Sequence, residues 1–549
     1  MAPKALQLLL LSTALVSTSA ADKELEAQLL ELSQEIRDNN VQIEALKSQE
    51  GRIRMMAEHR RLADDGNQAP SILGGSTDGL TMYRPYTSSE SLSGAMDHMW
   101  LLLNGFLVMF MQAGFAMLEA GTCRRRFVQN ILLKNLTDVC IGTLGWWCFG
   151  WSFALSGGIA DNKFIGGTQF LGHHFAVSNA DGQIEPTSTT AMWFFQWCFA
   201  SAAATIVSGG VAERVKFPGY CLYSFLLTSF IYPVVVAWTW GGGFLAQTGS
   251  VGYMDFAGSG IVHMTGGVGS LVGSVIAGPR TNRFKTGRMQ WEPPLEAGDE
   301  FAPHSETLIE VGTAILFFGW FGFNMGSILA MNSVELALLA GHIAMTTTIS
   351  GVVGGLVTYC LYYALFRKQS LGAFCNGVLA GLVSITAGCS TVSNGSSIVV
   401  GILGALIYQG SSSLLKFVKI DDPLDAFPIH GACGAWGVMA AALFDWGAGF
   451  DYVHGWNGFS CMLNDPDDSA SGCMSGVGWE LVGINLAEII CITLWVAVLS
   501  AIVFLLLKLL GLLVASPEEQ AVGFDEAKHS PRKAYDFQQG DEPNEGNNI

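Results

Sequence analysis

The chain has 549 residues, of which 50% are hydrophobic and 13% charged, and its mean hydropathy is +0.38. Soluble proteins carry about 25% charged residues, so this composition excludes an ordinary soluble protein and indicates a membrane protein. The formal net charge of −18 argues against a nucleic-acid partner.

The first twenty residues are typical of a secretory signal peptide. Lys4 precedes an apolar run from Ala5 to Val16, and small residues follow up to Ala20. The run is too short to cross a bilayer, which takes about 20 residues, whereas its composition suits cleavage near Ala20. An uncleaved anchor is the alternative.

Residues 22–61 carry a heptad pattern. The apolar positions, at alternating four- and three-residue spacing, are Leu25, Leu29, Leu32, Ile36, Ile43, Leu46 and Ile53. Asn39 and Glu50 occupy core positions, where polar residues weaken a coiled coil but can fix its register. The pattern predicts a short parallel coiled coil that ties protomers together, and a single amphipathic surface helix is the alternative. Residues 62–94, rich in Gly, Ser, Asp and Pro, are expected to form a flexible linker.

Residues 95–515 contain about eleven apolar segments of spanning length with short loops between them. The segments centre near Phe110, Gly145, Ala203, Leu227, Ser270, Leu316, Val353, Leu382, Gly404, Val438 and Val496. We therefore predict an all-α membrane protein with eleven transmembrane helices.

The basic residues indicate the orientation of these helices. Every second loop is basic, and the residues concerned are Arg124 to Arg126, Arg214, Lys216, Arg280, Arg283, Lys285, Arg288, Arg367, Lys368, Lys416 and Lys419. By the positive-inside rule these loops are cytoplasmic. The N-terminus is then outside, and residues 516–549 form a cytoplasmic tail.

Asp255, His263 and His430 are polar residues within or beside apolar segments. A charged side chain at the centre of a membrane helix costs roughly 2.5 to 3.5 kcal/mol on insertion scales, so such residues are functional candidates. Both histidines stand in the pattern apolar-His-x-x-x-Gly, and five helices separate them. This spacing predicts an inverted repeat of five plus five helices with one extra helix, and one polar path near the midplane.

The motifs around these residues resemble those of a known family. They are Asp255-Phe-Ala-Gly-Ser-Gly-Ile-Val-His263, Gly319-Trp-Phe-Gly-Phe-Asn-Met-Gly-Ser327 and Asp421-Asp-Pro-Leu-Asp-Ala-Phe-Pro-Ile-His430-Gly-Ala-Cys-Gly434. Over about residues 95–535 the chain resembles the ammonium transporters of the Amt/Rh family, specifically the Amt branch of plants and algae. The resemblance implies a homotrimer in the plasma membrane with one pore per subunit, taking ammonium, ammonia and methylammonium. It implies no enzyme activity, no cofactor and no metal.

The resemblance also assigns roles to individual residues. Asp255 is expected near the outer site, holding the local backbone and favouring a cation. The other matched positions are Trp240, Ser327 and Phe199 for outer recognition, Phe199 and Phe323 for a phenyl gate, and His263 and His430 for the pore.

Charge and burial constrain how the substrate crosses. Moving a bare cation into an apolar pore costs tens of kcal/mol, so we expect ammonium to release its proton near the gate and to cross as ammonia. Whether the proton also crosses separates electrogenic uptake from an electroneutral ammonia channel, and the resemblance favours electrogenic uptake. An ammonium sensor that signals through its tail is an alternative. A membrane enzyme or metal protein is disfavoured because neither histidine has a second His, Asp or Glu at i+3 or i+4 and no Cys pair stands beside them.

Five further residues carry expectations of their own. Cys461 and Cys473 lie in a polar loop and can pair if that loop faces an oxidising space. Asn394 starts an Asn-Gly-Ser sequon in a predicted outer loop, where it can be glycosylated. Ala527 stands where the family's tail carries a phosphorylated Thr, which puts that route of regulation in doubt, and Ser530 is a weak substitute.

Overall fold

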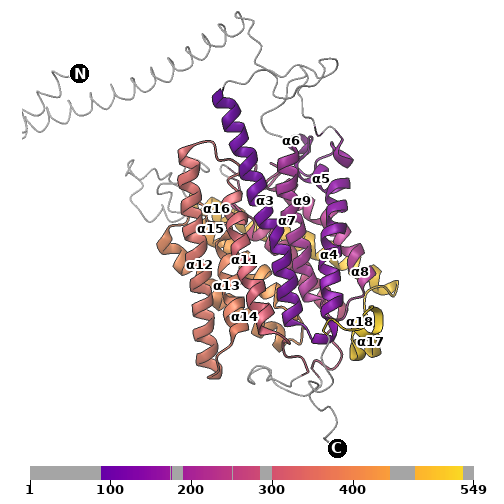
Figure 1. Cartoon of the computed structure of the whole chain (residues 1–549). Helices are drawn as coiled ribbons and strands as arrows, with labels where there is room; N and C mark the ends of the chain where they lie inside the picture. The colour runs from indigo at the N-terminus through magenta and orange to yellow at the C-terminus, as the bar shows by residue number, and fades with distance from the viewer. Residues whose placement is uncertain are drawn as a thin grey trace, which may run out of the picture. The chain divides into compact units, whose positions relative to one another are not determined.

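The computed structural model describes residues 88–173, 175, 189–249, 252–284, 300–444 and 477–535. Within these ranges the chain is helical, apart from one isolated β-bridge between Val215 and Val514 (Figure 1). The predicted signal peptide, the predicted coiled coil, and the loop with Cys461 and Cys473 lie outside the described residues. So does most of the predicted linker, although the first helix already begins at Ser88.

The first half of the helical unit ends with the segment that carries His263. Its main elements are α3 (Ser88–Thr122), α4 (Val128–Gly145) continued by η2 (Trp146–Gly150) and α5 (Trp151–Leu155), α7 (Thr189–Gly210), α8 (Phe217–Leu226) continued by η4 (Leu227–Ile231) and α9 (Tyr232–Trp238), and η5 (Ser259–Met264) continued by α10 (Thr265–Ala277). Short turns of helix are η1 (Arg125–Phe127), α6 (Ile159–Asn162) and η3 (Phe170–Gly172).

The second half ends with the segment that carries His430. Its elements are α11 (Glu306–Gly326), α12 (Val334–Phe366), α13 (Leu371–Thr386), α14 (Asn394–Phe417), and η6 (Phe427–Ala432) continued by α15 (Cys433–Leu443). A serine side chain caps the start of each helix from α11 to α14 by accepting a hydrogen bond from a backbone N–H group. These serines are Ser305, Ser333, Ser370 and Ser393. The extra helix α16 (Val477–Leu509) and the tail helices α17 (Pro517–Val522) and α18 (Phe524–Lys528) follow.

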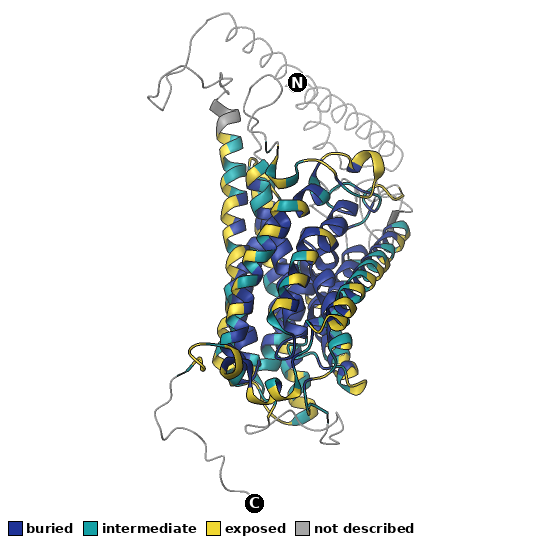
Figure 2. Ribbon diagram, turned by 90° about the vertical axis from the view of Figure 1, so that its right-hand side faces the viewer, coloured by how far each residue is buried: buried dark blue, intermediate teal, exposed yellow. Residues whose placement is uncertain are grey.

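The apolar outer surface of the unit identifies an integral membrane protein. Eight helices in the described part are long and apolar enough to span a bilayer. Their outward faces expose large apolar side chains while buried residues gather between the helices, as Figure 2 shows. On α16, for example, Leu494, Val498, Ile502 and Leu505 recur at helical spacing and are each about half exposed. Such a surface is stable in hydrocarbon and not in water.

The segments η5–α10 and η6 cross in close contact because glycines meet there. A Cβ added to Gly267 would lie 2.2 Å from the backbone nitrogen of Gly431. No side chain fits at this crossing. The contact brings His263 and His430, each in a π-helical turn, next to each other between the two halves.

The extra helix α16 bonds to both halves through Asn485. Its amide oxygen accepts the N–H of Met254 at 2.8 Å, and its amide nitrogen donates to the carbonyls of Met254 at 3.0 Å and Val438 at 2.7 Å. Met254 precedes η5 in the first half, and Val438 lies in α15 of the second. The side chain is fully buried.

Several loops predicted to be cytoplasmic meet in a buried ion network at one end of the helices. Glu213 pairs with Arg124 and, at 3.1 Å, with Arg280. Arg280 also donates to Asp421 at 2.9 Å. Burial would raise the pKa of Glu213, but the charges of Arg280 and Arg124 outweigh it and hold that pKa below the ordinary carboxyl value. Burial and Arg280 oppose each other in the same way at Asp421, whose pKa is also lowered.

The tail docks on this end of its own chain. Asp525 accepts the N–H groups of Gln129 and Asn130 at 2.8 and 2.9 Å, in the first turn of α4. Phe524 packs edge-on against Phe127 with ring centroids 5.3 Å apart. Figure 1 shows α17 and α18 beside this end of α4.

Candidate functional site

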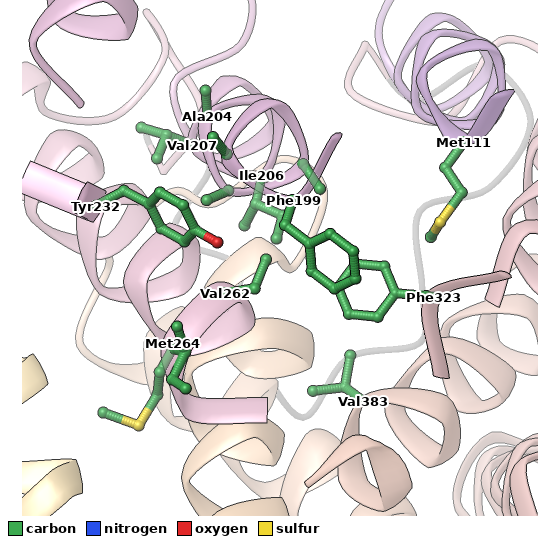
Figure 3. Close-up of a cluster of buried hydrophobic side chains, with 14 of the residues drawn as sticks. Met111, Phe199, Ala204, Ile206, Val207, Tyr232, Val262, Met264, Phe323 and Val383 are labelled. Atoms are coloured by element: carbon green, nitrogen blue, oxygen red, sulfur yellow. The ribbon is translucent and has the colours of Figure 1, made fainter. Parts of the chain in front are cut away.

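Two phenyl rings meet in the centre of the helical unit. Phe199 of α7 and Phe323 of α11 lie with ring centroids 4.2 Å apart, and both side chains are almost completely buried. Figure 3 shows the two rings next to each other, tilted by 38°, among apolar neighbours that include Val262 and Val383. The pair forms an apolar barrier with nothing to solvate an ion.

Trp240 lies next to this barrier, directly after the end of α9. Its ring is perpendicular to that of Phe199, with centroids 5.8 Å apart, and it is partly exposed. The indole N–H donates to the backbone carbonyl of Asp255 at 3.0 Å, which fixes the plane of the ring. Ser327, at the end of α11, lies one helical turn from Phe323 and donates to its carbonyl at 2.9 Å. Its lone pairs remain able to accept a hydrogen bond.

Asp255 is buried and caps the start of η5. One carboxylate oxygen accepts the N–H groups of Gly258 and Ser259, and the other those of Gly260 and Ile261, all at 2.8–3.0 Å. Four N–H donors stabilise the ionised form of a carboxyl group. The chain can wrap around the carboxylate because Gly258 adopts φ +103°, a conformation that favours glycine.

His263 and His430 lie beyond the barrier and face each other. Their rings are stacked with centroids 5.2 Å apart, and the two Nδ1 atoms are 3.2 Å apart. One Nδ1 must therefore donate and the other accept. The Nε2 atom of His263 is buried and has no hydrogen-bond partner within the described residues, so it can bond to a small molecule between the helices.

Trp320 is a site residue that we did not single out from the sequence. Its ring stacks on His263 with centroids 5.0 Å apart and an interplanar angle of 16°, and its N–H donates to Thr386 at 2.9 Å. It lies in the motif that led to Phe323, but the sequence does not show which way its ring points. Its position fixes the orientation of the first pore histidine.

These residues form a single file. Each aromatic ring or imidazole contacts the next, in the order Trp240, Phe199, Phe323, His263 and His430. They come from four helical elements and the turn after α9, so the fold brings together five of the seven residues that the sequence motifs suggested for recognition, gate and pore. Asp255 contacts the file through the indole N–H of Trp240. Ser327 joins the file only through Phe323. In the described part of the chain, no group of three or more His, Cys, Asp or Glu side chains is placed to hold a metal ion.

A family model named Ammonium Transporter Family matches residues 99–535. The chain belongs to this family. Ammonium transporter 1 member 3 of Solanum lycopersicum is 36% identical over 466 residues, which are 82% of this chain and 95% of the relative. Ammonium transporter Amt2 of Archaeoglobus fulgidus is 36% identical over 452 residues, covering 81% and 89%. These members of the ammonium transporter family are named as transporters and not as enzymes.

Solved structures agree with the sequence relatives. The structure of a Sensor Amt Protein matches with a TM-score of 0.67 and 28% identity, covering 80% of this chain and 99% of that one. Mep2 of Saccharomyces cerevisiae matches with a TM-score of 0.64 and 25% identity, covering 79% and 90%. The resemblance inferred from the motifs is thus confirmed at the level of the family.

Asn394, the predicted glycosylation site, lies within the described residues. It is the first residue of α14, directly after the capping residue Ser393, and is partly buried. The sequon therefore starts at a helix end and not in an open loop.

Proposed function

We propose that this protein carries ammonium across a membrane. The observation that supports this most directly is the file of rings from Trp240 through the phenyl pair to the two histidines. A partly exposed indole, a dry apolar barrier and a buried hydrogen-bonding pair suit a small cation that is captured, loses its proton and crosses as a neutral molecule.

Capture takes place at Trp240. Its ring face attracts a small cation by about 0.5 to 2 kcal/mol, Ser327 accepts a hydrogen bond, and the charge of Asp255 favours a cation nearby. Phe199 borders the same site. Since bringing a bare cation into the apolar barrier costs tens of kcal/mol, the ammonium ion releases its proton before it passes.

Ammonia then passes the phenyl pair and reaches the histidines. Nε2 of His263 offers it a hydrogen bond. The contact between the two Nδ1 atoms gives a route along which a proton can follow separately. Transport is then electrogenic, whereas an electroneutral ammonia channel would use the same file without this relay. Voltage clamp during an ammonium pulse distinguishes the two.

The topology and assembly belong to the same proposal. The eight long spans, the shorter helices α13 and α15 and the stack of α4, η2 and α5 supply the eleven predicted crossings. In the plasma membrane the N-terminus is outside and the C-terminus inside, and three subunits assemble. The coil of residues 22–61 then lies outside on the threefold axis, after signal-peptide cleavage, on the same side as a Cys461–Cys473 disulfide and a glycan at Asn394.

An ammonium sensor is the second candidate. It is supported by the match to a Sensor Amt Protein and by the docking of Asp525 on α4. Ala527 is exposed in α18 and cannot be phosphorylated, so a signal would use another residue. A chain truncated after Ala515 that retains uptake but loses a downstream response would favour the sensor.

Growth and current measurements test the transporter. We expect the intact chain to restore growth on ammonium in a strain that lacks ammonium uptake, and Trp240→Ala and His263→Ala to reduce growth and current at equal expression. A protein that reaches the membrane but supports neither growth nor uptake of labelled methylammonium would refute the proposal.

A further inference from the structure

Glu488 is a buried carboxyl group that the proposed pathway does not use. It lies in the middle of α16, its side chain has no exposed surface, and neither oxygen accepts a hydrogen bond from any described group. An ionised carboxylate in such a place would cost several kcal/mol. The group must therefore be neutral or have a partner.

Among the described residues, the carboxyl group closest at hand is that of Asp255. A Cβ added to Gly260 in η5 would lie 3.0 Å from Oε1 of Glu488 and 3.3 Å from Oδ2 of Asp255, so both carboxyl groups face the same side of this glycine. The two carboxyl groups are therefore neighbours at this glycine and act on each other electrostatically.

The described elements around Glu488 supply no positive charge to neutralise it. The helices α10 and α15, which pack against α16, contain no charged residue, and Cys433 of α15 is a neutral thiol. The titratable groups that interact with Glu488 are Asp255, Tyr253 and Cys491. His263 is the titratable residue of η5 itself, and its ring faces His430.

The two carboxyl groups cannot both be ionised in contact, because like charges this close repel strongly in an apolar site. Asp255 receives four N–H bonds, which stabilise its ionised form. Glu488 receives none. The proton therefore belongs on Glu488.

We propose that Glu488 is a protonated carboxylic acid that donates a hydrogen bond to Asp255, so that the pair holds one negative charge behind Trp240. Glu488 is then a positioning residue. It contacts no substrate but keeps Asp255 ionised when the outer solution becomes acidic. The part of this proposal that concerns cation capture rests on the proposed function; the location of the proton does not.

Infrared spectroscopy of the purified full-length protein tests the location of the proton directly. We expect the wild type to show the C=O stretching band of a protonated carboxylic acid, shifted in D2O, and Glu488→Gln to lack it. The proposal is wrong if the Gln variant keeps the whole band. Glu488 would then be ionised in the wild type, as it would be beside a bound cation. This result is independent of transport.

The pH profile of uptake tests the positioning role. An amide at residue 488 can still donate to Asp255, so Glu488→Gln should retain the wild-type profile. Glu488→Leu removes the donor, which disfavours the ionised form of Asp255. As the medium is acidified, this variant should therefore lose uptake at a pH about 1 to 2 units higher than the wild type does. Equal pH profiles for the wild type and the Leu variant would refute the positioning role. Loss of uptake in a folded Gln variant would refute it too, because an amide cannot replace a carboxyl group that must ionise or pass on a proton. A wild type without uptake would refute the proposed function and leave the infrared result valid.

Discussion

Individual hydrogen bonds hold one ring of the file, Trp240, and one ring that stacks on it, Trp320. Trp240 is anchored by Asp255, and the ring of Trp320 by Thr386. Rings held in this way lose little entropy when substrate binds, so the site is preorganised.

The contribution of Trp240 to capture can be measured. Replacing it with Leu keeps an apolar side chain but removes the ring face that attracts a cation. We expect the ammonium concentration for half-maximal uptake to rise about 2- to 30-fold. Trp147→Leu is the matched control, because Trp147 lies on η2 with 41% of its side chain exposed. An unchanged concentration in the Trp240 variant would mean that the cation is recognised elsewhere.

The sequence predicted the site residues that stand in linear motifs. The phenyl pair and both histidines stand in recognisable motifs, and the fold brings them into contact. Trp320 and Glu488 escaped notice for different reasons. The role of Trp320 depends on the direction of its ring, which only packing determines. Glu488 is an acidic residue in an apolar segment, the same signal that identified Asp255, and that signal could have been used for it too.

At the scale of helices, glycine contacts set the distance between the two histidines. Gly267 of α10 meets Gly431 of η6 backbone to backbone. The motifs include both glycines, but only the structure shows that they touch each other.

Gly267→Ala should therefore separate the two histidine segments. A Cβ placed 2.2 Å from a backbone nitrogen forces the helices apart, which overpacks the core at a cost of about 1 to 3 kcal/mol and breaks the contact between the imidazoles. We expect a lower apparent melting temperature in detergent and a loss of most uptake.

Gly483→Ala on α16 is the control, because a Cβ there meets nothing within 4 Å. Its uptake should equal that of the wild type. If the Gly267 variant matched this control in both measurements, the backbone at the crossing would be free to shift and the contact would not set the pore geometry.

Helix positions were largely predictable, and helix details were not. Hydropathy gave the segment centres, because lipid-facing helices must be apolar along their length. The π-helical turns η5 and η6 were not expected, since a change in hydrogen-bond register leaves no mark in composition. The start of α3 at Ser88 lies within the predicted linker because Ser and Gly do not prevent a helix that continues from an apolar span.

For the molecule as a whole, the buried ion network couples loops that are far apart in the sequence. Replacing Glu213 with Gln leaves Arg124 and Arg280 without their shared carboxylate, and loss of one partner of a buried pair costs about 3 to 5 kcal/mol. We expect a clear drop in the apparent melting temperature. Glu526→Gln, at an exposed position of α18, should have no such effect.

The same network predicts how stability depends on pH. The pKa values of Glu213 and Asp421 are lowered in the folded protein, so their contribution is complete above the ordinary carboxyl pKa of about 4 and is lost as the pH falls below it. Melting curves of the wild type should be unchanged from pH 7 to about pH 5 and shift downward below about pH 4. If the melting temperature already began to fall near neutral pH, titratable groups other than Glu213 and Asp421 would be responsible.

Assembly can be tested through the N-terminal segment. If residues 22–61 form a coil between subunits, deleting them should make the trimer dissociate at lower detergent concentration or temperature, while uptake remains measurable. Native mass spectrometry of both forms provides the comparison. Equal trimer stability would favour a surface helix.

The bonds of Asn485 have a consequence for the transport cycle. Carriers that alternate access by rocking one half against the other must break contacts between the halves in every turnover. Here α16 holds Met254 of one half and Val438 of the other through three hydrogen bonds on a single buried side chain. Rocking would leave that amide unsatisfied in an apolar interior each time. We therefore expect the substrate to move through a scaffold that stays still, with side chains and protons as the moving parts.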